Sequence, residues 1–369
     1  MKIGIITMHK VINFGSLLQA YALQEKIKQL GYENEIIDYD FPPKKNLSLI
    51  QRIIFWIYSF LVNVFSFGAI WRKKNRFKQF YNVNLKTTKE LYTNQSIHHN
   101  PPVYDVYMTG SDQVWNPNFI KTDTSFLLSF APFEKKHVSY ASSFAVNELD
   151  ENFCNLYTEH LRKYQNICVR EKSGVDIVKS LTGKDAQLVC DPTILLTRDD
   201  WDKLANKSSL SIDGKYILIY VLNYMFNPYP EIENLIKAVQ KEFGNMKIIY
   251  LEGRKKDVFS RNSKVIKDAG PNEFLYLFKH ASFVITTSFH GAAFSLIYGK
   301  PLYGVVKDVN SIDGRITSLL NRVGLNQAIT CYNSVDVLSK EQLLSLSCSE
   351  QALDDFRQYS ISMLQKTLI

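Results

Sequence analysis

Several common signals are missing from this chain of 369 residues. Its five cysteines are scattered and no two form a C-x-x-C pair, so neither a disulfide framework nor a zinc site is indicated. The turn after the first apolar run is not G-x-G-x-x-G, so it carries no dinucleotide-binding signature. The first residues, MKIGIITM, run straight into a strand-like segment without the layout of a signal peptide, which predicts a cytoplasmic protein.

No hydrophobic run is apolar enough to predict a transmembrane helix. The most apolar stretch, residues 49–70, is interrupted by Gln51, Arg52 and further polar residues. An aromatic-rich helix beside a basic cluster suits an interfacial helix on an anionic leaflet, so we predict a peripheral membrane contact through 49–78, at the inner face of the plasma membrane. Two core helices with a solvated basic tail are the alternative. The basic cluster consists of Arg72, Lys73, Lys74, Arg76 and Lys78.

The composition is that of an ordinary globular protein, with 46% hydrophobic and 22% charged residues. A net charge of +8 favours anionic partners such as nucleic acid, phosphorylated metabolites or a membrane surface. Nucleic acid is the least favoured of these, because basic and aromatic residues are interleaved only between Trp71 and Phe80.

Strand and helix patterns alternate along the chain, and the composition turns polar around residues 195–213. We therefore expect two α/β domains, 1–195 with an apolar and basic insertion at 47–80, and 196–369. Such alternation predicts two parallel, helix-covered sheets that face a cleft. The helical segment at 339–369 is expected to pack back on the first domain.

The most informative stretch is residues 282–306. An apolar β-branched strand at 283–286 ends in the polar turn TTSFHG, a helical pattern follows at 292–298, and a second strand begins after Pro301. In open α/β sheets such turns lie at the carboxyl edge, where ligands bind. Free N–H groups at the helix start would attract an anion, and His290 stands beside them. A satisfied histidine at a helix start is the alternative.

Polar residues also follow other predicted strands. The loop after the first strand contains Asn13 and Gly15, which suits either a plain tight turn or a phosphate or sugar loop. The strand at 103–109 ends in GSDQVWNP, where a tryptophan can stack on a sugar while a carboxylate binds hydroxyls. Arg170 ends a further strand, and arginine suits bidentate contact with phosphate or carboxylate. A surface pair of Arg170 and Glu171 is the alternative.

These pieces together resemble the polysaccharide pyruvyltransferase family over nearly the whole length. The resemblance implies a GT-B-like pair of Rossmann-type domains, with the acceptor side in the first and the donor side in the second. It also implies that a pyruvyl group passes from phosphoenolpyruvate to two hydroxyls of a sugar, in a precursor of a bacterial capsule or other exopolysaccharide, forming a cyclic ketal and phosphate. The matching segments are NFGSLLQAYALQ, TGSDQVWNP, SYASSF, ICVREKSG, VCDPTILL and GPNEFLYLFKHASFVITTSFHGAAFSLIYGKPLYGV.

The resemblance also implies site residues, with one departure. Some members carry arginine where this chain has Ser288, so another cation must meet the donor phosphate. We expect His290 to act as the acid or to stabilise the leaving phosphate, and Asp112 to act as the base or to grip the acceptor. The catalytic candidates are His290, Asp112 and Arg170. The donor-binding candidates are Arg170, Ser288, His290, Gly291 and Arg315, and the acceptor-binding candidates are Asn13, Gly15, Gln19, Ser111, Asp112 and Trp115.

No metal or cofactor is expected, with phosphoenolpyruvate as the donor substrate and a saccharide, either free or lipid-linked, as the acceptor. Two other readings stay open. A GT-B glycosyltransferase would share the cleft and the helix N-terminus but would use a sugar nucleotide. A non-catalytic sugar-binding protein of capsule assembly would bind saccharides without releasing phosphate.

Overall fold

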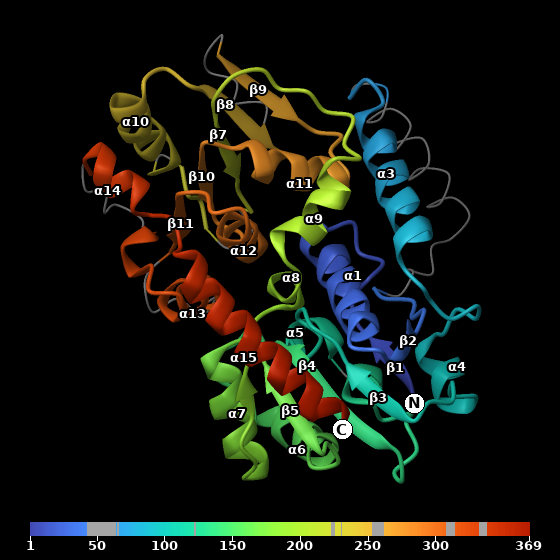
Figure 1. Cartoon of the computed structure of the whole chain (residues 1–369). Coiled ribbons are helices and arrows are strands. Elements are labelled where there is room, and N and C mark those ends of the chain that lie inside the picture. The colour runs from blue at the N-terminus through green and yellow to red at the C-terminus, as the bar shows by residue number, and fades with distance from the viewer. Residues whose placement is uncertain are drawn as a thin grey trace.

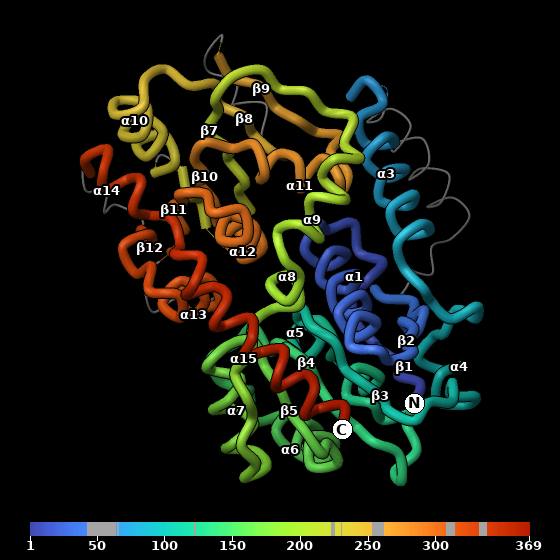
Figure 2. The backbone as a smooth tube through the Cα atoms, in the orientation of Figure 1, coloured from blue at the N-terminus to red at the C-terminus, as the bar shows by residue number. Residues whose placement is uncertain are grey.

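The computed structural model describes residues 1–42, 64, 66–121, 123–222, 226–229, 231–252, 262–307, 314–331 and 338–369. These residues form two six-stranded sheets, ordered β2-β1-β3-β4-β5-β6 and β12-β11-β10-β7-β8-β9. Every neighbouring pair of strands is parallel. The expected pair of Rossmann-like sheets is confirmed (Figures 1 and 2). We call the part that carries β1–β6 the amino-terminal half and the part that carries β7–β12 the carboxyl-terminal half.

The strands are short apolar runs because helices bury both faces of each sheet. All four residues of Phe283–Thr286, for example, are buried. The amino-terminal sheet contains β1 (Lys2–Ile6), β2 (Glu33–Ile36), β3 (Val106–Thr109), β4 (Lys136–Ser142), β5 (Asn166–Val169) and β6 (Gln187–Leu188). The carboxyl-terminal sheet contains β7 (Tyr216–Tyr220), β8 (Lys247–Leu251), β9 (Ser263–Ile266), β10 (Phe283–Thr286), β11 (Leu302–Val306) and β12 (Ile329–Cys331).

Helices cover the sheets and fill the space between them. In Figure 1 the short helix α8 lies between α1 and α12, where the two halves meet. The helices are α1 (Phe14–Gln29), α3 (Ala69–Asn84), α4 (Asn94–His99), α5 (Pro117–Ile120), α6 (Glu151–Leu161), α7 (Lys172–Thr182), α8 (Pro192–Leu195), α9 (Arg198–Ala205), α10 (Glu231–Phe243), α11 (Pro271–His280), α12 (Phe289–Ile297), α13 (Arg315–Arg322), α14 (Lys340–Leu344) and α15 (Glu350–Leu368).

Apolar spacing predicts a helix over residues 17–30, but helix α1 begins three residues earlier, at Phe14. The side chain of Asn13 accepts a hydrogen bond from the Ser16 amide at 3.2 Å and caps the first turn. Phe14 then stacks on Phe274 of α11, with ring centroids 4.7 Å apart. The first turn of α1 is therefore held against the carboxyl-terminal half.

The carboxyl-terminal helix crosses back to the amino-terminal half, as expected. Figure 1 shows α15 running down to β4 and β5. The Cys190 amide donates to Ser360 Oγ at 2.9 Å, and Arg357 Nε donates to the carbonyl oxygen of Ile194 at 2.7 Å. These buried bonds join the two halves on the side away from α3.

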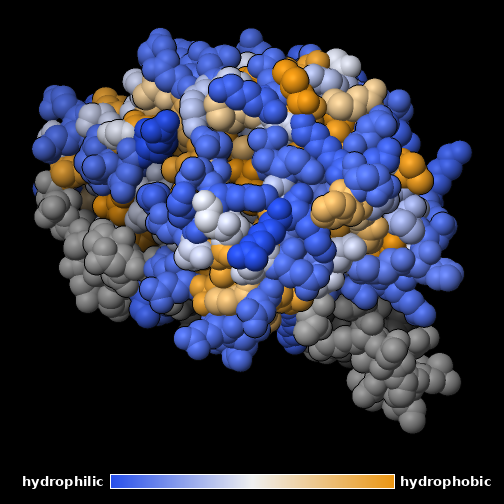
Figure 3. Space-filling model, turned by 90° about the horizontal axis from the view of Figure 1, so that it is seen from below, coloured by the Kyte–Doolittle hydropathy of each residue, from blue (hydrophilic) through white to orange (hydrophobic). Residues whose placement is uncertain are grey.

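Most of the segment predicted to contact a membrane, 49–78, lies outside the described residues. Its described part forms α3, where Arg72 Nε lies 2.8 Å from Asp268 Oδ2 and Lys73 pairs with Glu252. Part of the basic cluster therefore faces acidic groups of the carboxyl-terminal half. Among the helices that the structure describes, none combines the length and hydrophobicity that a membrane crossing needs. The face in Figure 3 is mostly hydrophilic, with apolar residues in separate patches.

Candidate functional site

A cavity of about 820 Å³ lies between the two halves, at the carboxyl ends of their strands. Both halves contribute side chains to its wall. Ligands of open parallel sheets bind at this edge, so the position agrees with the predicted cleft. The predicted site residues that line it are Asn13, Asp112, Ser288, His290 and Arg315.

Helix α12 points its amino terminus at this cavity. It begins at Phe289 instead of Ala292, because the Ser288 hydroxyl accepts a hydrogen bond from the Gly291 amide at 3.3 Å. The amides of Phe289 and His290 have no partner inside the helix. A side chain at Gly291 would place its Cβ 2.2 Å from Thr286 Oγ1, so only glycine fits there. The turn therefore offers backbone N–H groups to an anion.

Asp112 is held in a strained position at the cavity wall. Its φ angle is +76°, a left-handed conformation that costs energy for a residue with a side chain. Its Oδ2 accepts a hydrogen bond from Ser16 Oγ, and its Oδ1 accepts from the Gln113 amide at 2.9 Å. The carboxylate is therefore fixed in orientation where a substrate can reach it.

Arg170 lies behind this wall and not among the residues that line the cavity. Its side chain is 1% exposed, with Nη1 donating to Asp191 Oδ2 at 2.8 Å and Nη2 lying 3.5 Å from Asp112 Oδ1. The ring of Phe289 stacks on the guanidinium, 4.7 Å away. In this structure Arg170 joins two carboxylates and does not line the cavity.

Asp191 is a site residue that the sequence analysis missed. Its Oδ1 accepts hydrogen bonds from the amide and the hydroxyl of Thr193, and its Oδ2 accepts from Ser111 Oγ at 3.0 Å. Burial by itself would raise the pKa of Asp191, but the contact with His290 and the charge of Arg170 hold that pKa well below its ordinary value. The carboxylate is therefore ionised. Its position after β6, in the segment VCDP, was the available signal.

His290 reaches across from α12 to this group. Its Nε2 is 3.7 Å from Asp191 Oδ2, and it is buried without a hydrogen-bond partner in the described part of the chain. The other edge of the ring faces Gly15, where an added Cβ would lie 1.9 Å from Nδ1. Gly15 therefore does not line the cavity but leaves room for the imidazole.

A third acidic group beside Arg170 is Glu171, whose Oε2 lies 3.9 Å from Arg170 Nε. Glu171 Oε1 accepts a hydrogen bond from the Phe144 amide at 2.8 Å. Burial raises the pKa of the Glu171 carboxyl, although the charges of Arg170 and Arg315 oppose this shift. Arg315 begins α13, and unlike Arg170 it lines the cavity. It is therefore the arginine that faces the cavity.

Three predicted acceptor residues lie behind the cavity wall. Gln19 Nε2 donates to Thr7 Oγ1 at 2.9 Å, and Ser111 bonds to Asp191. Trp115 is 0% exposed and donates its indole N–H to a backbone carbonyl, so it belongs to the core of the amino-terminal half. Asn13, in contrast, lines the cavity while it caps α1.

The cavity has aromatic groups that the sequence analysis did not identify. Phe119 lies on the one-turn helix α5, is 51% exposed and lines the cavity together with Phe41. Asn116 caps that helix and Pro117 opens it, so the segment just after Trp115 turns outward. The asparagine–proline pair was the signal for this turn.

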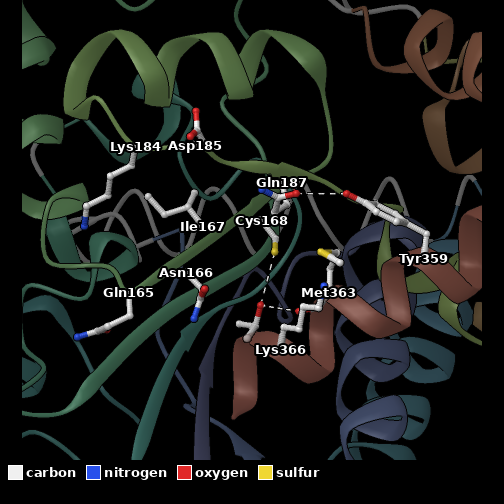
Figure 4. Close-up of a pocket in the computed structure, with 11 residues that line it drawn as sticks. Gln165, Asn166, Ile167, Cys168, Lys184, Asp185, Gln187, Tyr359, Met363 and Lys366 are labelled. Atoms are coloured by element: carbon white, nitrogen blue, oxygen red, sulfur yellow. Dashed lines mark hydrogen bonds between the residues drawn. The ribbon is translucent and has the colours of Figure 1, made fainter.

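Figure 4 shows a second cavity, of about 630 Å³, between β5 and α15. It lies beside Asn166, the first residue of β5, and so opens at the end of the sheet opposite Asp112. The Cys168 thiol there is 3.6 Å from Thr367 Oγ1, and burial raises the pKa of this thiol to about 11. An inert thiol and surface side chains do not match the chemistry expected at the cleft.

Solved structures show the same fold. UDP-GlcNAc 2-epimerase from Methanocaldococcus jannaschii matches with a TM-score of 0.54 and 14% identity, covering 94% of this chain and 91% of that chain. The UDP-GlcNAc 2-epimerase from Neisseria meningitidis, bound to UDP-GlcNAc, matches with a TM-score of 0.55 and 10% identity, covering 99% and 100%. The UDP-N-acetylglucosamine 2-epimerase from Rickettsia bellii matches with a TM-score of 0.54 and 8% identity, covering 100% of this chain and 95% of that chain. At such identities the likeness shows the GT-B-like fold alone.

The sequence comparisons give the family. No curated protein matches this chain. The family model described as polysaccharide pyruvyl transferase matches residues 13–307. That range starts at the cap of α1 and includes Asp112, Arg170, Asp191 and His290. The chain therefore belongs to the polysaccharide pyruvyl transferase family, which makes it a transferase.

Proposed function

We propose that the protein transfers the pyruvyl group of phosphoenolpyruvate to two hydroxyls of one sugar in a surface polysaccharide precursor, forming a cyclic ketal and free phosphate. The observation that supports this most is the meeting of an imidazole, a fixed carboxylate and a helix amino terminus at one interdomain cavity. His290 and the start of α12 come from one half, and Asp112 comes from the other. The donor and the acceptor can then approach from opposite walls.

The donor carries a phosphate and a carboxylate, so its site needs cations and backbone N–H groups. The free amides at the start of α12 suit the phosphate. Arg315 lines the same cavity and supplies the positive charge that Ser288 does not. Arg170 acts from behind, where it fixes the carboxylates of Asp112 and Asp191. In this arrangement Arg315 replaces the arginine found two residues before the histidine in some members.

The reaction needs two proton transfers besides the two new C–O bonds. Each acceptor hydroxyl adds its oxygen to C2 of the donor, and the bond from C2 to the phosphate oxygen breaks. The methylene carbon gains one proton and becomes a methyl group, while the second hydroxyl proton leaves with phosphate. We assign delivery of a proton to His290 and removal of hydroxyl protons to Asp112. Because Asp112 is fixed by Ser16 and the Gln113 amide, it stays aligned with the acceptor.

Phosphoenolpyruvate alone is expected to raise the melting temperature of the protein. A ligand that binds only the folded state at 100 times its Kd adds about 2.7 kcal/mol of stability. Arg315→Ala should abolish the shift, whereas Arg162→Ala, which changes an exposed arginine that follows the last residue of α6, should retain it. Differential scanning fluorimetry measures both.

The same melting experiment, repeated with other ligands, distinguishes pyruvyl transfer from the two alternative functions. A shift with a sugar nucleotide and none with phosphoenolpyruvate would replace the proposal with a glycosyltransferase. Binding of phosphoenolpyruvate and a saccharide without release of phosphate would instead indicate a non-catalytic binding protein.

Phe119 is proposed as an acceptor contact, because an exposed ring at the cavity wall can stack on a sugar face. Phe119→Ala should raise the KM for the acceptor about three- to tenfold and leave kcat nearly unchanged, the size of a contact worth ~1 kcal/mol. Phe133→Ala removes a ring that is 78% exposed but does not line the cavity, and it should change neither constant. Equal effects of the two substitutions in steady-state kinetics would contradict the assignment.

A further inference from the structure

The two ring nitrogens of His290 lie in different surroundings. Nε2 is enclosed and faces the carboxylate of Asp191, with 3.7 Å between Nε2 and Oδ2. Nδ1 lies on the edge of the ring beside Gly15, and the side chain is 11% exposed toward the cavity that it lines. Nε2 is therefore closed to substrates and faces Asp191, while the residue borders the cavity with the rest of its ring.

Asp191 cannot turn away from the imidazole without losing several bonds. Its Oδ1 accepts from Thr193 N at 3.0 Å and from Thr193 Oγ1 at 2.8 Å. Its Oδ2 accepts from Ser111 and from Arg170. With the side chain 0% exposed, these bonds fix Oδ2 in the direction of His290. An ionised carboxylate in this position is the natural acceptor for a proton carried by Nε2.

The charges around this pair favour the same arrangement. Arg170 lies between two carboxylates, Asp112 and Asp191, so one positive charge is shared by two negative ones. Glu171 Oε2 lies 3.9 Å from Arg170 Nε, and the charge of Arg315 also acts on the Glu171 carboxyl. The charge of the Asp191 carboxylate lies beside Nε2, where it attracts an N–H group.

We propose that Asp191 is a positioning residue that keeps a proton on Nε2 of His290, which makes Nδ1 the nitrogen that exchanges protons with the substrates. A neutral imidazole carries one N–H, and the hydrogen bond of one nitrogen decides which nitrogen is free. With Nε2 protonated, Nδ1 accepts a proton in the neutral ring and donates one from the imidazolium. The absence of a side chain at Gly15 leaves room for the Nδ1 edge of the ring.

The chemical role of this nitrogen rests on the proposed pyruvyl transfer. In each turnover Nδ1 gives one proton to the donor and regains one of the two protons that Asp112 removes from the acceptor hydroxyls, while the other leaves with phosphate. Atoms and charges then balance, and Asp191 keeps its charge throughout. Ser111 also helps to position Asp191, because its hydroxyl donates a hydrogen bond to Asp191 Oδ2.

The first test needs no substrate, so its result does not depend on the identity of the donor. Protein labelled with ¹⁵N-histidine is examined by NMR, and the His290 signals are identified by their loss in His290→Gln. We expect Nε2 of the wild type to be protonated in the neutral ring. Asp191→Asn should change the ¹⁵N shifts of His290, whereas Asp185→Asn, which changes an exposed aspartate beside the second cavity, should not. An unprotonated Nε2 in the wild type would overturn the proposal, even where the Asp191 variant does not fold.

The second test measures turnover with phosphoenolpyruvate and a saccharide acceptor. Asp191→Asn should lower kcat about 10²- to 10³-fold, the range of a positioned acid or base. Its KM for phosphoenolpyruvate should stay within about threefold of the wild type, because Asp191 does not line the cavity. Asp185→Asn should keep kcat within about threefold. A folded Asp191→Asn protein with wild-type kcat overturns the proposal. Wild-type protein that binds no phosphoenolpyruvate instead counts against the proposed function and leaves the NMR result standing.

Discussion

His290→Gln is expected to lower kcat about 10³-fold, because a positioned acid or base contributes ~10²- to 10⁴-fold to proton transfer. Glutamine is polar and of similar length, so it can occupy the same position at the start of α12 without protonating a carbon. The free amides at that helix start do not depend on the side chain, so binding of phosphoenolpyruvate should be weakened much less than turnover. Release of phosphate in the presence of an acceptor measures the effect.

His280→Gln is the matched control for this substitution. His280 is exposed at the end of α11, in the same half of the protein, and does not line the cavity. Its replacement should leave kcat unchanged. If His290→Gln kept turnover within tenfold of the wild type, the assignment of the acid to this residue would be wrong.

Gly15→Ala is expected to lower kcat by at least ~10²-fold although the new side chain is a single methyl group. Its Cβ would lie 1.9 Å from Nδ1 and 2.3 Å from Cε1 of His290, so the imidazole must leave its position beside Asp191. Misplacing a catalytic group in this way lowers the reaction rate about 10²-fold. Because Gly15 lies in the first turn of α1, the better helix propensity of alanine, ~1 kcal/mol at most, offsets part of the packing strain. Stability should therefore change much less than activity.

Gly174→Ala separates the loss of the imidazole position from a general effect of adding a methyl group in a helix. Gly174 lies in α7, and its nearest contact for an added Cβ is Val169 Cβ at 3.3 Å, which a small shift relieves. Melting temperatures and steady-state kinetics of both variants give the comparison. Normal kcat in Gly15→Ala, with the His290 NMR signals unmoved, would contradict the close approach that the structure shows.

The positions of the first helical turns show where sequence patterns reach their limit. Apolar spacing predicted that α1 starts at Leu17 and α12 at Ala292, yet both begin three residues earlier. Asn13 and Ser288 are polar and so were assigned to loops, but their side chains accept hydrogen bonds from amides of the first turn. Capping thus adds a turn that carries no apolar periodicity, and it brings Gly15 and His290 into the helices.

The sequence also does not show which aromatic ring, Trp115 or Phe119, reaches the cavity. The sequence favours the tryptophan as a sugar platform, because it follows a strand at the edge where ligands bind. In the structure Tyr164 and Phe144 pack against its indole ring, and Phe119 at the end of the next turn reaches the cavity. Which aromatic ring is buried depends on helices that approach from elsewhere in the chain, and local pattern does not contain that information.

By itself the sequence determined the alternation of strands and helices, because buried strands and one-sided helices need distinct apolar patterns. It also determined that Asp112 and His290 follow strands, and therefore that they lie at the carboxyl edges of parallel sheets. Only the tertiary structure decided that Asp191 faces His290, that Arg170 is enclosed between carboxylates, and that Arg315 faces the cavity. These contacts join residues from the two halves or from different strands, and they arise from packing forces that no local stretch of the chain encodes.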